Sequence, residues 1–178
     1  MVRLARDVGN PWLSAMALFS FSMVAERSGD IDAARARLSE CAVLFRQMRD
    51  RHFINVTQSE LGHIERRLGN YAEAVKLYHE TIAGWLELGN RSALAHELES
   101  LAIIAAAQDR RRRAARLFGA AEALRETIGS SMTALERSEY VKAITRARAQ
   151  MDESGWSAAW AEGRALPLDQ AVAFALEE

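Results

Sequence analysis

The sequence predicts an all-α fold, a right-handed α-solenoid of antiparallel helix pairs that ends in a C-terminal helical cap. Turn signals recur every 40 residues, at Gly9-Asn10, Arg49-Asp50, Gly89-Asn90 and Gly129-Ser130. A second set, which includes Gly29-Asp30 and Gly69-Asn70, falls half a period later. Such a period is typical of stacked helix pairs, because one pair cannot bury both of its apolar faces alone. Good helix formers dominate and only two prolines occur, which favours helices throughout.

Small residues at one phase of the period predict where neighbouring helices touch. In the first helix of each pair they are Ser22, Gly62 and Ala102. In the second helix they are Ala34, Ala74 and Ala114, each followed four residues later by a large apolar residue, Leu38, Tyr78 or Phe118. Small side chains let two helix axes approach, and the large ones fill the space beside them.

The turn signals divide a single domain over residues 1–178 into successive elements. Residues 1–10 are expected to be the tail of a preceding repeat that the chain lacks. Three repeats follow at 11–50, 51–90 and 91–130, with helices expected at 12–27, 31–48, 52–67, 71–88, 92–107 and 111–128. Residues 131–178 are expected to form capping helices at 134–151, 155–164 and 168–177. Glycine in a left-handed conformation closes each helix, and Asp, Asn or Ser caps the next one.

The second repeat resembles a tetratricopeptide repeat. Leu61-Gly62 on its first helix, Gly69-Asn70-Tyr71 in its turn and Ala74-x-x-x-Tyr78 on its second helix carry the resemblance. The usual unit has about 34 residues, so each helix here is expected to be about one turn longer. The closing proline of the motif is absent from this repeat.

The C-terminal part resembles more specifically the end of large bacterial transcriptional regulators, the signal-transduction ATPases of the LuxR/MalT type. Two stretches carry this resemblance, Ala114–Arg125 (AARLFGAAEALR) and Trp160–Val172 (WAEGRALPLDQAV). The resemblance implies that the chain is a fragment that follows a nucleotide-binding domain in a longer bacterial protein. It also implies a sensor or regulatory role.

Charge and cysteine content narrow the function classes. The 23 basic and 24 acidic residues give a net charge of −1, whereas a dedicated nucleic-acid-binding domain usually has a basic excess. Cys41 is the single cysteine, and we expect a buried, inert thiol at that repeat position. No secretory signal is visible in the sequence, and we expect a cytoplasmic location.

No motif for catalysis, cofactor binding or metal binding is visible. The sequence contains neither a Gly-x-x-x-x-Gly-Lys nor a Gly-x-Gly-x-x-Gly loop, which are the phosphate-binding signatures. The four histidines are His52, His63, His79 and His96, and no two of them are four residues apart, as a zinc-binding helix would need. We therefore expect a non-enzymatic module without a cofactor.

A concave groove lined by the first helix of each pair is the candidate binding surface. The residues expected to point into it are Met16, Phe19, Met23, Arg27, Val56, Ser59, His63, Arg67, His96, Glu99 and Ile103. An extended or helical peptide, or a small effector, would suit such a groove. In the alternative interpretation, Met16, Phe19 and Met23 packed on the missing preceding repeat. An apolar end face of that kind predicts self-association through the N-terminal helix pair.

Arg110, Arg111, Arg112 and Arg113 form the one run of like charge. They stand where a helix begins, and the helix dipole disfavours cations there. One interpretation is a basic patch that contacts an acidic partner or nucleic acid. The other is a solvated turn whose charge Asp109 and nearby acids offset.

These observations predict a protein- or effector-binding repeat module in a larger ATPase-type regulator. The alternative is a stand-alone scaffold that assembles other proteins. Nucleic-acid binding through the arginine run is a further alternative, which the net charge disfavours, and an enzyme is the least favoured. The sequence names neither the partner nor the output domain.

Overall fold

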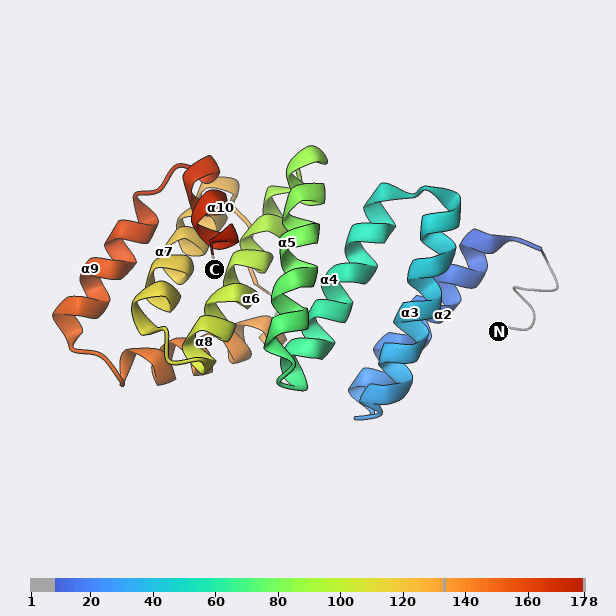
Figure 1. The fold of residues 1–178 in the computed structure, drawn as a ribbon, viewed down its shortest axis with the longest axis horizontal. Coiled ribbons are helices and arrows are strands. Elements are labelled where there is room, and N and C mark those ends of the chain that lie inside the picture. The colour runs from blue at the N-terminus through green and yellow to red at the C-terminus, as the bar shows by residue number, and fades with distance from the viewer. Residues whose placement is uncertain (1–8, 133, 178) are drawn as a thin grey trace. The chain divides into compact units, whose positions relative to one another are not determined.

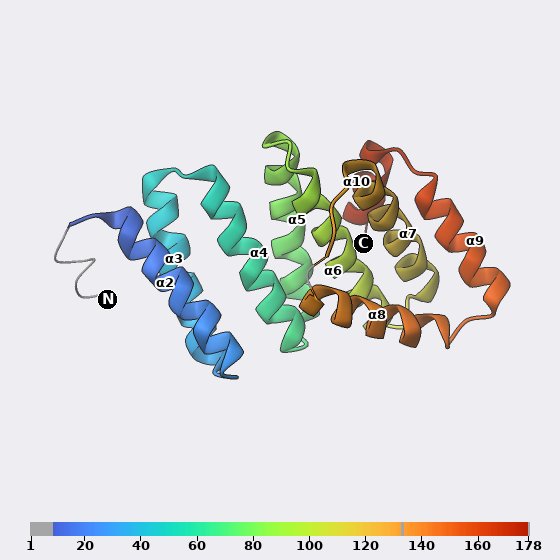
Figure 2. The same cartoon turned by 180° about the vertical axis from the view of Figure 1, so that it is seen from behind.

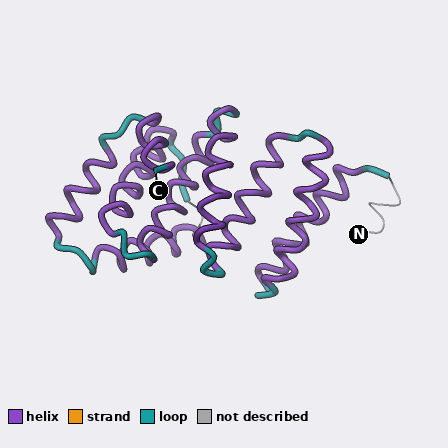
Figure 3. The backbone as a smooth tube through the Cα atoms, viewed as in Figure 1, coloured by secondary structure: helices purple, strands orange, loops and turns teal. Residues whose placement is uncertain are grey.

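The computed structural model describes residues 9–132 and 134–177, and all regular structure within them is helical (Figure 3). The nine helices of this part of the chain are α2 (Pro11–Arg27), α3 (Ile31–Met48), α4 (Arg51–Arg67), α5 (Tyr71–Glu87), α6 (Arg91–Ala107), α7 (Arg111–Ile128), α8 (Ala134–Arg148), α9 (Glu153–Arg164) and α10 (Leu168–Leu176). The predicted all-α helical-repeat class is confirmed. Residues 1–8, most of the expected tail of a preceding repeat, lie outside the described residues.

Side-chain caps start the helices where the turn signals predicted them. The side-chain oxygens of Asn10, Asp30 and Asp50 accept hydrogen bonds from backbone N–H groups in the first turns of α2, α3 and α4. After the C-terminal ends of α2 and α4, Gly29 and Gly69 take φ values of 84° and 80°, which glycine adopts without steric cost. The helix boundaries therefore agree with the sequence-based ones to within three residues.

The largest boundary difference is at α8, which was expected to reach residue 151 and ends at Arg148. The N–H groups of Gln150 and Met151 bond to carbonyls three residues earlier, so the chain tightens into a turn there. The carbonyl of Gln150 also accepts a hydrogen bond of 2.6 Å from Arg111 Nη1. This contact fixes the turn to the start of α7.

The chain forms two compact units, one that ends at Gly84 and one that begins at Trp85. The expected single domain stays a prediction. In the first unit the small and large residues of the period are buried, as predicted: Ala34, Leu38, Ala74 and Tyr78. A methyl group on Gly62 would lie 2.7 Å from Tyr78 Cε1, so the tyrosine ring rests directly on the α4 backbone.

The second unit is layered around α7. Helix α6 packs against one side of α7 and α9 runs along the other (Figure 1). Leu98, Leu117 and Phe118 are buried in this core together with the predicted small residues Ala102 and Ala114. Helix α8 instead runs crosswise to α6 and α7 and contacts both (Figure 2).

Two glycines bring α7 and α9 into backbone contact. A methyl group on Gly163 would overlap the carbonyl oxygen of Arg116, and one on Gly119 would overlap the carbonyl oxygen of Trp160. Neither overlap can be relieved by rotating a side chain, since both involve backbone atoms. The glycines therefore set the distance between α7 and α9, and Trp156 is buried beside this contact. None of the described helices is long and apolar enough to span a bilayer.

Candidate partner-binding site

One position of the 40-residue repeat is aromatic in the first two helix pairs and charged in the third. The position filled by Phe45 in the first pair and by Trp85 in the second is filled by Arg125 in the third. All three side chains are buried. A buried arginine in place of a buried aromatic residue needs a partner, and its partner identifies the candidate site.

Glu99 of α6 is that partner. Arg125 donates from Nε to Glu99 Oε1 at 2.5 Å and from Nη2 to Glu99 Oε2 at 2.7 Å, so the pair is bidentate. The two side chains are only 10% and 5% exposed. Well-packed apolar residues would stabilise this position at least as well as a buried ion pair. Departures of this kind from a repeat concentrate at functional sites.

The ion pair borders a pocket of about 360 Å³ between the end of α7 and α8. The pocket is lined by Glu122, Arg125, Glu126, Gly129, Ser130, Ser131, Met132, Arg137, Tyr140 and Val141. The hydroxyl of Ser130 accepts a hydrogen bond of 3.4 Å from Arg125 Nη1, which orients the guanidinium on the pocket side. The pocket thus combines hydroxyls, arginines and the tyrosine ring.

Tyr140 is the aromatic side chain that α8 contributes to this pocket, beside Arg137 and Val141. Its ring meets Phe118 of α7 edge to face, with 5.3 Å between centroids, a favourable aromatic geometry. Burial raises the pKa of its hydroxyl, and the nearby carboxylates of Glu122 and Glu99 raise it further. The hydroxyl therefore stays neutral and keeps its proton to donate.

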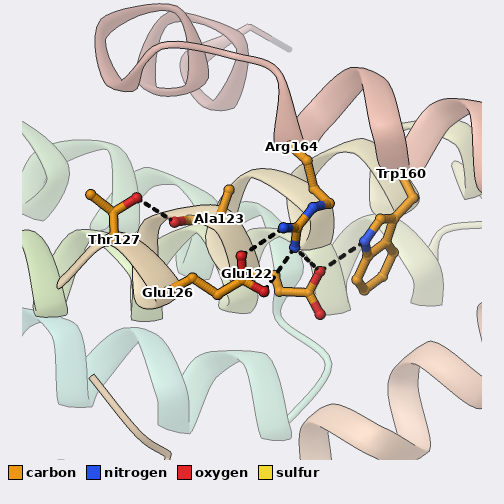
Figure 4. Close-up of polar contacts among 6 residues, drawn as sticks. All are labelled: Glu122, Ala123, Glu126, Thr127, Trp160 and Arg164. Atoms are coloured by element: carbon orange, nitrogen blue, oxygen red, sulfur yellow. Dashed lines mark hydrogen bonds and ion pairs between the residues drawn. The ribbon is translucent and has the colours of Figure 1, made fainter. Parts of the chain in front are cut away.

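The carboxylates on the α9 side of the pocket are already engaged (Figure 4). Arg164 donates to both Glu122 and Glu126, and the indole Nε1 of Trp160 donates to Glu122 Oε2 at 3.0 Å. The hydrogen bond from Arg164 lowers the pKa of Glu126. Both acids serve to hold α9 on α7.

The structure scatters the predicted groove residues over several environments. On α2, Met16 and Phe19 pack against apolar clusters of the first unit, Met23 is half-buried and Arg27 is exposed. Met16 and Phe19 stay half-buried, and their packing on a preceding repeat stays a prediction.

On α4 and α6 the predicted groove residues are divided between buried and exposed positions. Ser59, His63 and Glu99 are buried; Val56, His96 and Ile103 are half-buried and Arg67 is exposed, paired with Glu26. His63 Nδ1 lies 2.8 Å from the Tyr78 hydroxyl, so its ring belongs to the α4–α5 contact instead of an open groove. Of the eleven residues, Glu99 alone takes part in the site described above, through its pair with Arg125.

The arginine run contacts the C-terminal helices. Arg111 pairs with Asp109 at 2.6 Å, as the solvated-turn interpretation expected. Arg112 pairs with Glu162 of α9 at 2.8 Å. Arg113 donates to the carbonyls of Ala175 and Glu177 and lies over the Phe174 ring. Arg110 occupies the N-cap position of α7 and makes no side-chain cap bond. Three of the four arginines thus have intramolecular partners.

Sequence reasoning missed Arg125, Tyr140 and the serines before α8. The signal for Arg125 was present, because the 40-residue period aligns it with Phe45 and Trp85. No comparable signal marks Tyr140, since the period ends at Gly129. Among the described residues, no group of three His, Cys, Asp or Glu side chains could hold a metal ion.

Residues 53–127 match the tetratricopeptide repeat family. The stretch runs from α4 into the last turn of α7 and includes Glu99 and Arg125, whereas α8, α9 and α10 lie beyond it. No curated protein and no solved structure matches the chain. The chain therefore contains a tetratricopeptide-type region, and repeats of this kind serve as protein-interaction modules.

Proposed function

We propose that the chain is a non-catalytic module that binds a protein partner on the surface of α6 and α7 around Glu99 and Arg125. The replacement of a buried aromatic residue by this ion pair supports the proposal most directly. Arg125 reaches the lining of the pocket from this buried pair, beside Ser130 and the Tyr140 ring. A peptide side chain can bind in such a pocket, and the repeat region is of a type that binds proteins.

A nucleic-acid partner is disfavoured by the same contacts. Phosphate recognition needs arginines whose donors face solvent. Arg111 and Arg113 instead donate to Asp109 and the C-terminal carbonyls, and the charge of Arg112, which is 73% exposed, is offset by Glu162. The net charge of −1 adds no long-range attraction for phosphate.

We further propose that this module is the C-terminal regulatory part of a larger ATPase-type transcriptional regulator in the bacterial cytoplasm. Partner binding would then be passed to the linked nucleotide-binding domain. A stand-alone scaffold is the alternative. The complete reading frame separates the two: a nucleotide-binding domain in the same frame supports the regulator, and its absence supports the scaffold.

Site-specific photo-cross-linking tests the binding surface. A photoreactive amino acid replaces Arg137, which is exposed and lines the pocket, or Lys76, an exposed control on α5. We expect a protein adduct from position 137 in cells of the source organism, and none of the same mass from position 76. No protein adduct at position 137 would have two explanations: the ligand is a small effector, or the proposed surface binds nothing. Cell metabolites that raise the melting temperature of the chain would indicate the effector, and an unchanged melting temperature would remove the proposal.

A second copy of the chain is the partner we propose for α2. Leu13, Phe21 and Val24 are 44%, 41% and 63% exposed and share one face of the helix by their spacing. Light scattering at high protein concentration should show a dimer for the natural chain and a monomer for Phe21→Asp. A monomer in both cases would remove this proposal.

A further inference from the structure

We propose that α8 is a displaceable strap: a helix of the chain itself that covers the α6–α7 surface on which a helix of the partner docks. The inference rests on the proposed function and adds the kind of partner and its regulation. The partner helix would replace α8 and make the contacts that α8 now makes.

The first support is the loose packing of α8. Pockets of about 360 Å³ and 230 Å³ lie against it, the first along Tyr140 and Val141 and the second along Ile144 and Arg148. Both pockets are open to solvent, and the second is shared with Trp156 and Trp160 of α9. Helix α8 packs less extensively on α6 and α7 than α9 packs on α7, where Gly119 and Gly163 bring the two backbones together.

The second support is that α9 is attached to α7 by contacts in which α8 has no part. The two glycines set the α7–α9 contact, and the ion pairs of Arg164 with Glu122 and of Arg112 with Glu162 reinforce it. Hydrogen bonding of Gln150 to Arg111 holds the turn after α8 in place. The pair of Arg148 with Glu153, which joins α8 to α9, is exposed on both sides and costs little to break. Helix α8 can therefore leave its position while α9 stays docked on α7.

The third support is the pattern of side chains that α8 presents to the surface. Ala147 is buried and Tyr140 and Ile144 are half-buried, a spacing of four and then three residues. Amphipathic helices bind grooves through anchors at this spacing. Lys142, on the opposite face of the helix, is exposed. Helix α8 thus makes the type of contact that a docked partner helix makes.

The surface under α8 defines the chemistry of the partner. Phe118 offers an aromatic edge contact, and the Glu99–Arg125 pair lies beside the tyrosine hydroxyl with Ser130 next to it. A matching helix carries an aromatic side chain, best with a hydroxyl, and an aliphatic residue one turn later. Because α8 is tethered, its effective concentration is high, and the partner's apparent affinity falls by the fraction of time that α8 is closed.

A labelled peptide of residues 134–151, added to the full-length chain, tests the strap. Three proteins are compared: the natural chain, Tyr140→Ala/Ile144→Ala, which removes two anchors of α8, and the control Lys142→Ala on its exposed face. Fluorescence anisotropy should show the peptide binding the double variant at least about 10-fold more tightly than the other two. Equal binding to all three, or none to the double variant, would overturn the proposal.

Thiol labelling gives a second measurement that does not depend on the double variant. Cys41→Ala provides a cysteine-free background for Ala147→Cys in α8 or Ala159→Cys in α9, two positions that are each 1% exposed. Position 147 should label at least about 10-fold faster than position 159, because α8 opens alone. Equal rates would contradict the strap.

The two proposals fail separately. A partner adduct at position 137 of equal yield in the natural chain and the double variant would leave the binding surface standing and remove the strap. Peptide binding to the double variant without any partner adduct would support displacement of α8 and remove the proposed protein partner.

Discussion

At the scale of single residues, Cys41 conforms to the repeat pattern and Arg125 departs from it. Cys41 follows the repeat and is fully buried among apolar side chains with Phe45, whereas Arg125 breaks the repeat and needs Glu99 to be buried at all. The first position serves the core alone. Arg125 requires an acidic side chain beside it on α6. Replacing Arg125 therefore tests how much the ion pair matters for stability.

Arg125→Leu should lower the free energy of unfolding by about 3 kcal/mol, because Glu99 is left buried without its partner. The free energy of unfolding of Glu99→Leu/Arg125→Leu should lie within about 1 kcal/mol of that of the natural chain, since apolar side chains fill both positions. Urea denaturation followed by circular dichroism measures both. A double variant as unstable as the single one would show that the pair is not the source of the cost.

The thiol of Cys41 should make stability depend on pH in the alkaline range. Desolvation raises its pKa from 9.0 to about 11 in the folded chain. As pH rises above 9 the unfolded chain ionises first, so the free energy of unfolding falls, by about 1 kcal/mol at pH 10. Urea denaturation at pH 8 and pH 10 should show this increment in the natural chain and lose it in Cys41→Ala. The same slope in both proteins would assign the effect to other groups.

At the scale of elements, α8 and α9 illustrate two ways of attaching a helix to a repeat. Backbone contact through Gly119 and Gly163 fixes α9 on α7. Helix α8 instead packs on α6 and α7 through side chains, and less extensively than α9 packs on α7. Helix α9 therefore completes the core of the second unit, whereas α8 covers a surface. The two helices differ in this way because of their packing, and not because of their length or helix propensity.

Gly163→Ala should lower the free energy of unfolding by about 1–3 kcal/mol, through overlap of the new methyl group with the Arg116 carbonyl. The expected sign is informative because glycine to alanine within a helix usually stabilises by up to about 1 kcal/mol. Ser157→Ala, an exposed position on the same helix, is the control and should change little. Urea denaturation followed by tryptophan fluorescence measures both variants; a stabilised Gly163→Ala would contradict the close α7–α9 contact.

At the scale of the whole molecule, the sequence predicted the helices because each repeats a local signal. Capping side chains such as Asp30 and left-handed glycines such as Gly29 mark most boundaries of the repeat helices. The crosswise course of α8 could not be predicted, since the period ends at Gly129 and no neighbour repeats its pattern. The division between Gly84 and Trp85 falls within α5, where composition does not change.

The candidate site was less predictable than the fold because its contacts join distant parts of the chain. Arg112 and Glu162 are fifty residues apart, and no local pattern links them. Placing the groove on the first helix of each pair found Glu99 and missed Arg125, which lies on a second helix. Comparison of the repeats position by position would have found Arg125, since aromatic residues occupy the two equivalent positions.

Hydrogen–deuterium exchange of the full chain, with and without the partner captured at position 137, tests the central claim most directly. Partner binding should slow exchange in the parts of α6 and α7 around Glu99 and Arg125, and should speed exchange in α8 as it is displaced. The α2–α3 pair should be unchanged. Slower exchange confined to the first unit, or in α8 itself, would contradict partner binding beneath the strap.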